Sequence, residues 1–149
     1  MKEVYLLTIG KLKDKSLSQI EEDYLKRLNS FKLKTIELKS LQEDKDAGAI
    51  SVLKKCKELS IDQIILLTEH TEVKDSPKFS KWFFNLLENS NKLALIIAGA
   101  AGPGKELIKA SNHKLSLSPL TFPHQLARLI LVEQLYRAQT IYQGHPYHK

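Results

Sequence analysis

The sequence KLALIIAGAAGPGKEL (residues 92–107) passes from an apolar run, through a loop of small residues, into a helical pattern. Residues 92–99 show no alternation of apolar and polar side chains, which is typical of a strand buried on both faces. In open parallel sheets, ligands bind beyond the carboxyl ends of the strands, and glycines there let the backbone approach a ligand closely. The stretch therefore predicts a buried parallel strand that ends at a small-molecule cleft.

The glycines of this loop do not form a dinucleotide-binding motif. Gly99, Gly102 and Gly104 have the wrong spacing, and the loop follows the fourth expected strand rather than the first. No acidic residue follows at the distance that would suit a ribose. A simple tight turn without a ligand is therefore an equal alternative at this point.

Strand and helix patterns alternate along the rest of the chain, with no linker and no internal repeat. Ser16 is the expected N-cap of the first helix, Ser76 and Pro77 begin the third, and Gly144 ends the last. This alternation predicts a three-layer α/β fold with a mainly parallel sheet, formed by one domain over residues 1–149. The expected strands are 3–10, 32–38, 63–68, 92–99 and 114–118, and the expected helices are 16–29, 49–59, 76–89, 104–111 and 123–143, with a charged surface loop or frayed helix start at 41–48.

The composition limits the classes of function. The net charge of +6 and the pI of about 9.3 permit an acidic partner such as RNA, but do not establish one. Cys56 is the single cysteine, which excludes a disulfide framework and a cysteine-based metal site, and we expect it to be a half-buried helical thiol. No signal-peptide pattern and no membrane-length apolar run is present, so we expect a soluble protein of a reducing cytoplasm with no membrane contact.

The last expected helix carries apolar residues around its whole circumference. A helix of this kind is buried on every side, whereas the sheet of so small a chain can cover only one. We therefore expect a homodimer with this helix in the interface. The apolar positions are Leu126, Leu129, Ile130, Leu131, Val132, Leu135, Tyr136, Ile141 and Tyr142.

Three charged or titratable residues of the same helix have alternative interpretations. Arg137 lies four residues after Glu133, so the two side chains are expected to form an ion pair. Arg128 projects about 180° away from Arg137 at 100° per residue and cannot share a patch with it. His124 lies in the first turn, which Thr121 could cap, and is either a packed residue or a base.

The chain finishes with GHPYHK (residues 144–149), where Gly144 and Pro146 predict a defined turn. The tail supplies titratable imidazoles, an aromatic ring that can stack on an unpaired base, and a cation for phosphate. A solvated tail without function is the alternative. No carboxylate accompanies His145 and His148, so we expect no metal site.

Three motifs now carry a family resemblance: AGAAG (98–102), LSLSPLTFPHQLARLILVEQLYRA (115–138) and HPYHK (145–149). They resemble the RlmH family of 23S rRNA (pseudouridine-1915-N3)-methyltransferases, which is similar to the SPOUT methyltransferases. The resemblance implies a C-terminal trefoil knot, a homodimer, S-adenosylmethionine as the cofactor, and 23S rRNA in the ribosome as the partner. General sequence rules would not suggest the knot, because knots are nearly absent from protein folds.

The resemblance also implies a donor site held largely by backbone. Ala98 is a departure, because the family usually has glycine there, and alanine disfavours a positive φ. The tail would reach the methyl donor of the partner subunit and contact the RNA. The implied cofactor-binding residues are Leu67, Ala98, Gly99, Gly102, Leu117, Ser118, Pro119, Leu120, Thr121 and Phe122.

Methylation of N3 of pseudouridine requires this nitrogen to lose its proton, so a base or a nearby cation is needed. The candidate catalytic set is His148 with Tyr147 and Arg137, and His124 is an alternative base. Two other functions remain open: a non-catalytic RNA- or ribosome-binding homodimer, and a nucleotide-binding α/β enzyme that acts on a small molecule.

Overall fold

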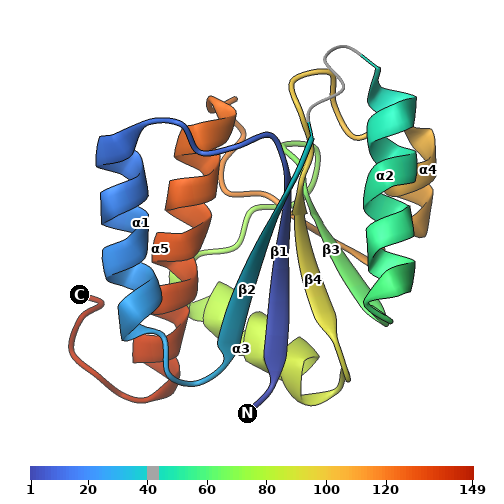
Figure 1. Cartoon of the computed structure of the whole chain (residues 1–149). Helices are drawn as coiled ribbons and strands as arrows, with labels where there is room; N and C mark the ends of the chain where they lie inside the picture. The colour runs from blue at the N-terminus through green and yellow to red at the C-terminus, as the bar shows by residue number, and fades with distance from the viewer. Residues whose placement is uncertain (40–43) are drawn as a thin grey trace.

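The protein is described by a computed structural model that covers residues 1–39 and 44–149. Its described strands form one sheet in the order β2-β1-β4-β3-β5, and every pairing is parallel (Figure 1). The mainly parallel sheet expected from the sequence is thereby confirmed. The strands are β1 (Glu3–Ile9), β2 (Lys32–Leu38), β3 (Gln63–Leu67), β4 (Leu93–Ile97) and β5 (His113–Leu115), and the helices are α1 (Lys15–Arg27), α2 (Lys45–Glu58), α3 (Ser76–Glu88), α4 (Lys105–Ala110) and α5 (His124–Tyr142).

Helices cover both faces of the sheet, as a three-layer fold requires (Figure 1). On β1, Val4 and Leu6 belong to the core shared with α1, α3 and α5, whereas Tyr5 and Leu7 belong to the core shared with α2 and α4. Successive strand residues point to opposite faces, so both sets must be apolar when both faces are buried. This is why the central strands show no alternation.

Helices α1, α2 and α3 begin at aspartates that the sequence patterns did not single out. The side chain of Asp14, rather than that of Ser16, caps α1 by accepting the amide hydrogen of Leu17 at 3.0 Å. Asp75 caps α3 in the same way, one residue before Ser76. In each case the carboxylate satisfies an amide that has no partner within the helix.

Helix α2 differs most from its expected extent. It begins at Lys45, four residues early, because the side chain of Asp44 caps it. The end of the segment expected as a charged loop or a frayed helix start is thus helical, while residues 41–43 of that segment lie outside the described residues. Ile50 is 64% exposed, whereas Val52 is fully buried. Ala49 and Val52 belong to the core between this helix and the sheet.

Helix α5 is covered on more sides than the sheet alone could cover, because α1 and α3 of the same chain flank it (Figure 1). Its all-round apolar character is therefore largely explained within one chain, contrary to the reasoning that required a second subunit. Leu126 and Tyr142 remain 42% and 55% exposed. Gly144 adopts φ 71° just after the helix, which confirms it as the stop.

Candidate functional site

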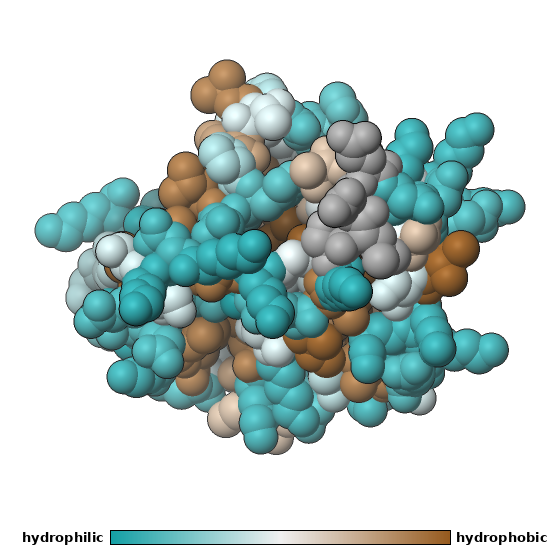
Figure 2. Space-filling model, turned by 45° about the horizontal axis from the view of Figure 1, so that its top comes forward, coloured by the Kyte–Doolittle hydropathy of each residue, from teal (hydrophilic) through white to brown (hydrophobic). Residues whose placement is uncertain are grey.

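A cavity of about 470 Å³ opens at the carboxyl edge of the sheet, beyond the ends of β3 and β4. The segment that follows β5 forms its opposite wall. Figure 2 brings this end of the molecule forward and shows apolar surface exposed between hydrophilic side chains. All of the residues that the resemblance associates with the donor line this cavity except Pro119: Leu67, Ala98, Gly99, Gly102, Leu117, Ser118, Leu120, Thr121 and Phe122.

The loop after β4 forms the floor of the cavity as a tight turn. The amide of Gly102 donates to the carbonyl of Gly99 at 3.0 Å, and Gly102 has φ 93°. Gly104 then begins α4 with φ 76°, and a Cβ there would lie 2.9 Å from the carbonyl oxygen of Lys45. Ala98 is not among the positive-φ residues, of which Ser60 is the one non-glycine described. An alanine is therefore accommodated at position 98 without backbone strain.

The segment after β5 is held in shape by its own side chains. Ser116 Oγ donates to the carbonyl of Ser118, and Ser118 Oγ accepts from the amide of Leu120, each at 3.0 Å. The hydroxyl of Thr121 donates to the carboxylate of Glu69, which comes from the end of β3. Thr121 therefore fixes the wall of the cavity instead of capping α5.

Residues 68–70 are cavity residues that the sequence reasoning missed. Thr68, Glu69 and His70 directly follow β3 and all three line the cavity. Their position beyond the carboxyl end of a parallel strand is the signal that could have identified them. Pro103, Ile108 and Lys114 also line it without having been predicted, and so does Ala100 of the loop 98–102.

His124, the first residue of α5, brings a titratable group to this cavity. It is exposed, and Pro123 precedes it as an N-cap that has no side-chain hydrogen bond. The imidazole of His124 therefore does not cap α5.

The other three candidate catalytic residues form a separate cluster around Glu133. Arg137 donates to Glu133 through Nε at 2.9 Å and Nη2 at 2.7 Å, which confirms the expected ion pair. Its Nη1 contacts His148 Nδ1 at 2.9 Å, and its guanidinium lies 4.9 Å from the centre of the Tyr147 ring. The Tyr147 hydroxyl donates to Glu133 at 3.2 Å. The tail is therefore folded against α5 of its own chain.

These contacts fix the chemical state of the tail. A guanidinium only donates, so His148 Nδ1 must accept from Arg137 and the proton of a neutral ring lies on Nε2. Burial, together with the Tyr24 and Glu133 contacts, raises the pKa of Tyr147, so its hydroxyl stays protonated at neutral pH. The Glu133 hydrogen bond likewise raises the pKa of Arg137. The cluster thus offers a cation, a hydrogen-bond donor and an aromatic ring.

The tail cluster and the cavity at the carboxyl edge of the sheet are neighbours rather than one site. His148 lines a second cavity, of about 430 Å³, against the start of α3. Leu117 lines both cavities, whereas none of the described residues that line the first one belongs to the tail. The structure therefore places His124 among the residues that the resemblance associates with the donor, and groups Arg137, Tyr147 and His148 apart from them.

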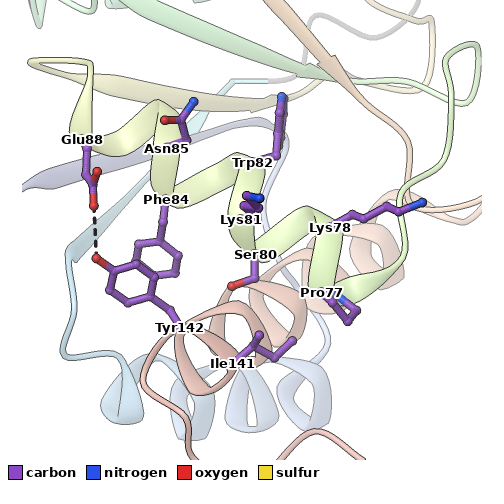
Figure 3. Close-up of a pocket in the computed structure, with 10 residues that line it drawn as sticks. All are labelled: Pro77, Lys78, Ser80, Lys81, Trp82, Phe84, Asn85, Glu88, Ile141 and Tyr142. Atoms are coloured by element: carbon purple, nitrogen blue, oxygen red, sulfur yellow. Dashed lines mark hydrogen bonds between the residues drawn. The ribbon is translucent and has the colours of Figure 1, made fainter.

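A further groove, between α3 and α5, contains none of the predicted site residues. Figure 3 shows Phe84 and Tyr142 stacked at one end, with ring centres 4.1 Å apart, and the Tyr142 hydroxyl bonded to Glu88. These contacts join α3 to the end of α5.

Among residues 1–39 and 44–149, no three His, Cys, Asp or Glu side chains gather in a group that could hold a metal ion. None of the described helices combines the length and apolar character needed to cross a membrane.

Comparison with known proteins identifies the family. A family model described as "Predicted SPOUT methyltransferase" matches residues 2–148. The chain belongs to the SPOUT methyltransferase family. Members of this family generally use S-adenosylmethionine as the methyl donor, and the resemblance expected from the sequence motifs is confirmed.

Individual SPOUT relatives match over nearly their whole length. A Bacillus cytotoxicus protein is 39% identical and an Enterococcus faecalis protein 37% identical, each over 98% of this chain and 99% of the relative. Both are named "Ribosomal RNA large subunit methyltransferase H". The SpoU methyltransferase AviRb from Streptomyces viridochromogenes superimposes with a TM-score of 0.48 at 10% identity, over 97% of this chain and 61% of that one. That likeness is too distant to add to the family assignment.

Proposed function

We propose that this SPOUT protein transfers a methyl group from S-adenosylmethionine to ribosomal RNA of the large subunit, at N3 of pseudouridine 1915 of 23S rRNA. The observation that carries the proposal is the convergence of three loops on one cavity at the carboxyl edge of the sheet. The names of the two relatives supply the class of RNA. The basic net charge of the chain suits an RNA partner.

The cavity suits a donor of the size of S-adenosylmethionine. Its volume of about 470 Å³ lies in the usual range of small-molecule sites, about 300–1,000 Å³. Loop 98–102 and the segment 117–122 would hold the donor, mainly through backbone groups, as the turn at Gly102 allows. We propose that these loops belong to the C-terminal trefoil knot of the family, within a single domain over residues 1–149.

The four candidate catalytic residues divide into two roles. When bound, the donor supplies a methyl group on a positively charged sulfur. His124 is the residue we assign to removal of the N3 proton, because its imidazole lines the donor cavity and is exposed. His148 suits a donor role better, since Arg137 occupies its Nδ1.

The tail cluster would serve the RNA side of the reaction. Arg137 carries the positive charge that favours an ionised base or a phosphate, and Tyr147 can stack on an unpaired nucleotide. Because the tail lies beside the cavity of its own chain and not in it, we propose that it completes the site of the partner subunit in a cytoplasmic homodimer. The exposed Leu126 of α5 supports a contact there.

The conformation of Ala98 weakens the sequence argument for a non-catalytic RNA-binding homodimer. That argument rested on alanine in place of glycine at position 98, and Ala98 does not adopt a positive φ. A non-catalytic homodimer would bind ribosomes without transferring a methyl group.

The test is methyl transfer from labelled S-adenosylmethionine to ribosomes that lack the modification. The intact protein, a variant lacking Tyr147–Lys149, and His124→Asn are compared, with calorimetry of donor binding on each. We expect the intact protein to transfer methyl, and both variants to bind the donor while losing transfer. Donor binding without transfer by the intact protein would contradict the proposed substrate. A fully active tail deletion would contradict the role of the tail.

A further inference from the structure

A cleft of about 780 Å³ adjoins the donor cavity, at the carboxyl ends of β1 and β2. The loop 10–13, the end of β2 and the start of α5 form its walls. Ile97 and His124 line this cleft and the donor cavity alike. The two cavities therefore meet at the imidazole to which the proton transfer is assigned.

The cleft is lined by cations that are available to a ligand. Lys11, Lys13 and Lys39 line it and are exposed, and among the described residues none of the three forms an ion pair. Arg128 and Glu37 also line the cleft, but they are bonded to each other, with Nη1 and Oε2 2.5 Å apart. Glu37 is the one carboxylate among the described residues that line the cleft, and it is paired with Arg128. The three lysines therefore give the cleft a positive charge, which favours an anion as its occupant.

The loop that carries two of these lysines is held in place by its backbone. Gly10 has φ 106° and donates to the carbonyl of Leu38 at 2.8 Å, which turns the chain away from β1. The amide of Leu12, between the two lysines, donates to Glu37 at 2.9 Å. Partial burial would raise the pKa of Glu37, but the Leu12 and Arg128 contacts outweigh it and hold that pKa below its usual value. Glu37 thus stays ionised and anchors the loop.

We propose that this cleft binds the phosphate backbone of the RNA next to the target nucleotide, with Lys11 and Lys13 as the principal phosphate contacts. The inference rests on the proposed function, which it extends by assigning the path of the substrate. Ammonium groups neutralise phosphates irrespective of base sequence, so they position a strand while the neighbouring cavity acts on one base. A strand lying here would present its nucleotide to His124 at the point where the two cavities meet.

The test compares Lys11→Gln/Lys13→Gln with the wild type. The matched control is Lys78→Gln/Lys81→Gln, which removes two lysines from the α3 groove of Figure 3. For the cleft variant we expect kcat/KM for methyl transfer to ribosomes to fall at least about tenfold, with the donor Kd unchanged. The slope of log K against log salt for ribosome binding should decrease by about 2, since each phosphate contact contributes about 1. The control should match the wild type in all three measurements.

The outcomes separate the cleft from the proposed function. If the wild type transfers methyl and the cleft variant matches it in kcat/KM and salt slope, the cleft assignment is wrong. If the variant loses donor affinity, the lysines serve the donor and not RNA, which also overturns it. If the wild type transfers no methyl, the proposed function fails, and the salt slope of ribosome binding still decides whether the cleft binds RNA. Binding to protein-free 23S rRNA that is equal for variant and wild type would indicate a protein contact instead.

Discussion

Arg128 and Glu21 form a buried bidentate ion pair that joins α5 to α1. Arg128 Nε donates to Glu21 Oε2 at 2.8 Å and Nη2 donates to Oε1 at 2.9 Å. Their side chains are only 9% and 6% exposed. The remaining guanidinium nitrogen reaches Glu37 at the end of β2, so one arginine links two helices and the sheet edge.

Arg128→Ala is expected to lower the free energy of unfolding by about 3–5 kcal/mol, because it leaves the Glu21 carboxylate buried without a partner. Urea denaturation measures the change. The control is Lys55→Ala, which breaks the exposed Lys55–Glu58 pair and should cost less than about 1 kcal/mol. If both variants lost the same free energy of unfolding, burial of the Arg128–Glu21 pair would not contribute to stability.

Gly104→Ala is expected to destabilise the protein more than Gly102→Ala. Both glycines have positive φ, which costs an alanine about 1 kcal/mol. At Gly104 a Cβ would also lie 2.9 Å from the Lys45 carbonyl oxygen, whereas nothing lies within 4 Å of one at Gly102. Thermal unfolding of both variants measures the difference, and a larger loss at Gly102 would contradict this account.

Cys56 is expected to be almost inert to alkylation in the folded protein. Burial raises its pKa from 9.0 to about 11, so only about one thiol in a thousand is ionised at pH 8. Because the folded pKa is the higher one, the contribution of this group to stability is complete below pH 9 and is lost as the pH rises towards 11. Iodoacetamide labelling in buffer and in urea tests this: rapid labelling of the folded protein at pH 8 would show an accessible thiolate.

Arg137→Lys is expected to reduce methyl transfer at least about tenfold without changing donor affinity. Lysine keeps the charge, but it cannot bond Glu133 through two nitrogens while also contacting His148. Steady-state transfer to ribosomes and calorimetry with the donor provide the two readouts. A variant with normal kcat would show that the charge alone suffices, and a fall in donor affinity would show that Arg137 acts in the donor cavity.

Much of the fold could be predicted because burial leaves a local pattern in the sequence. The bounds of β2 were predicted without error, since it alternates and is followed by a charged stretch. Helix starts were less accurate: Asp14 and Asp44 cap their helices through contacts with amides three residues on, and neighbouring serines or charged residues fit the same pattern. The cover of α5 by α1 and α3 depends on packing between distant segments, which periodicity does not record.

A cavity at the carboxyl ends of the strands could be predicted from the sequence, whereas the position of the tail could not. Loop 98–102 and residues 117–122 meet at one cavity because parallel strands end at one edge of the sheet. The separation of His148 from that cavity is set by the turn at Gly144, which folds the tail back along α5. The cleft at Lys11 and Lys13 depends on the hydrogen bond from the Leu12 amide to Glu37 of β2, which holds the loop 10–13 in place. No local sequence motif predicts a contact between residues so far apart in the chain.

The parallel register of β1 also dictates the order in which the chain can fold during synthesis. Val4 of β1 pairs with Leu93 of β4, about 90 residues later. Until the ribosome has delivered β4, the β1–β2 pair has an open inner edge and an apolar strand with no partner there. The donor cavity and the lysine cleft share Ile97 of β4, so neither can exist before that strand emerges. The wall at residues 117–122, His124 and the tail come later still, so a nascent chain cannot assemble the proposed site until almost all of it has been made.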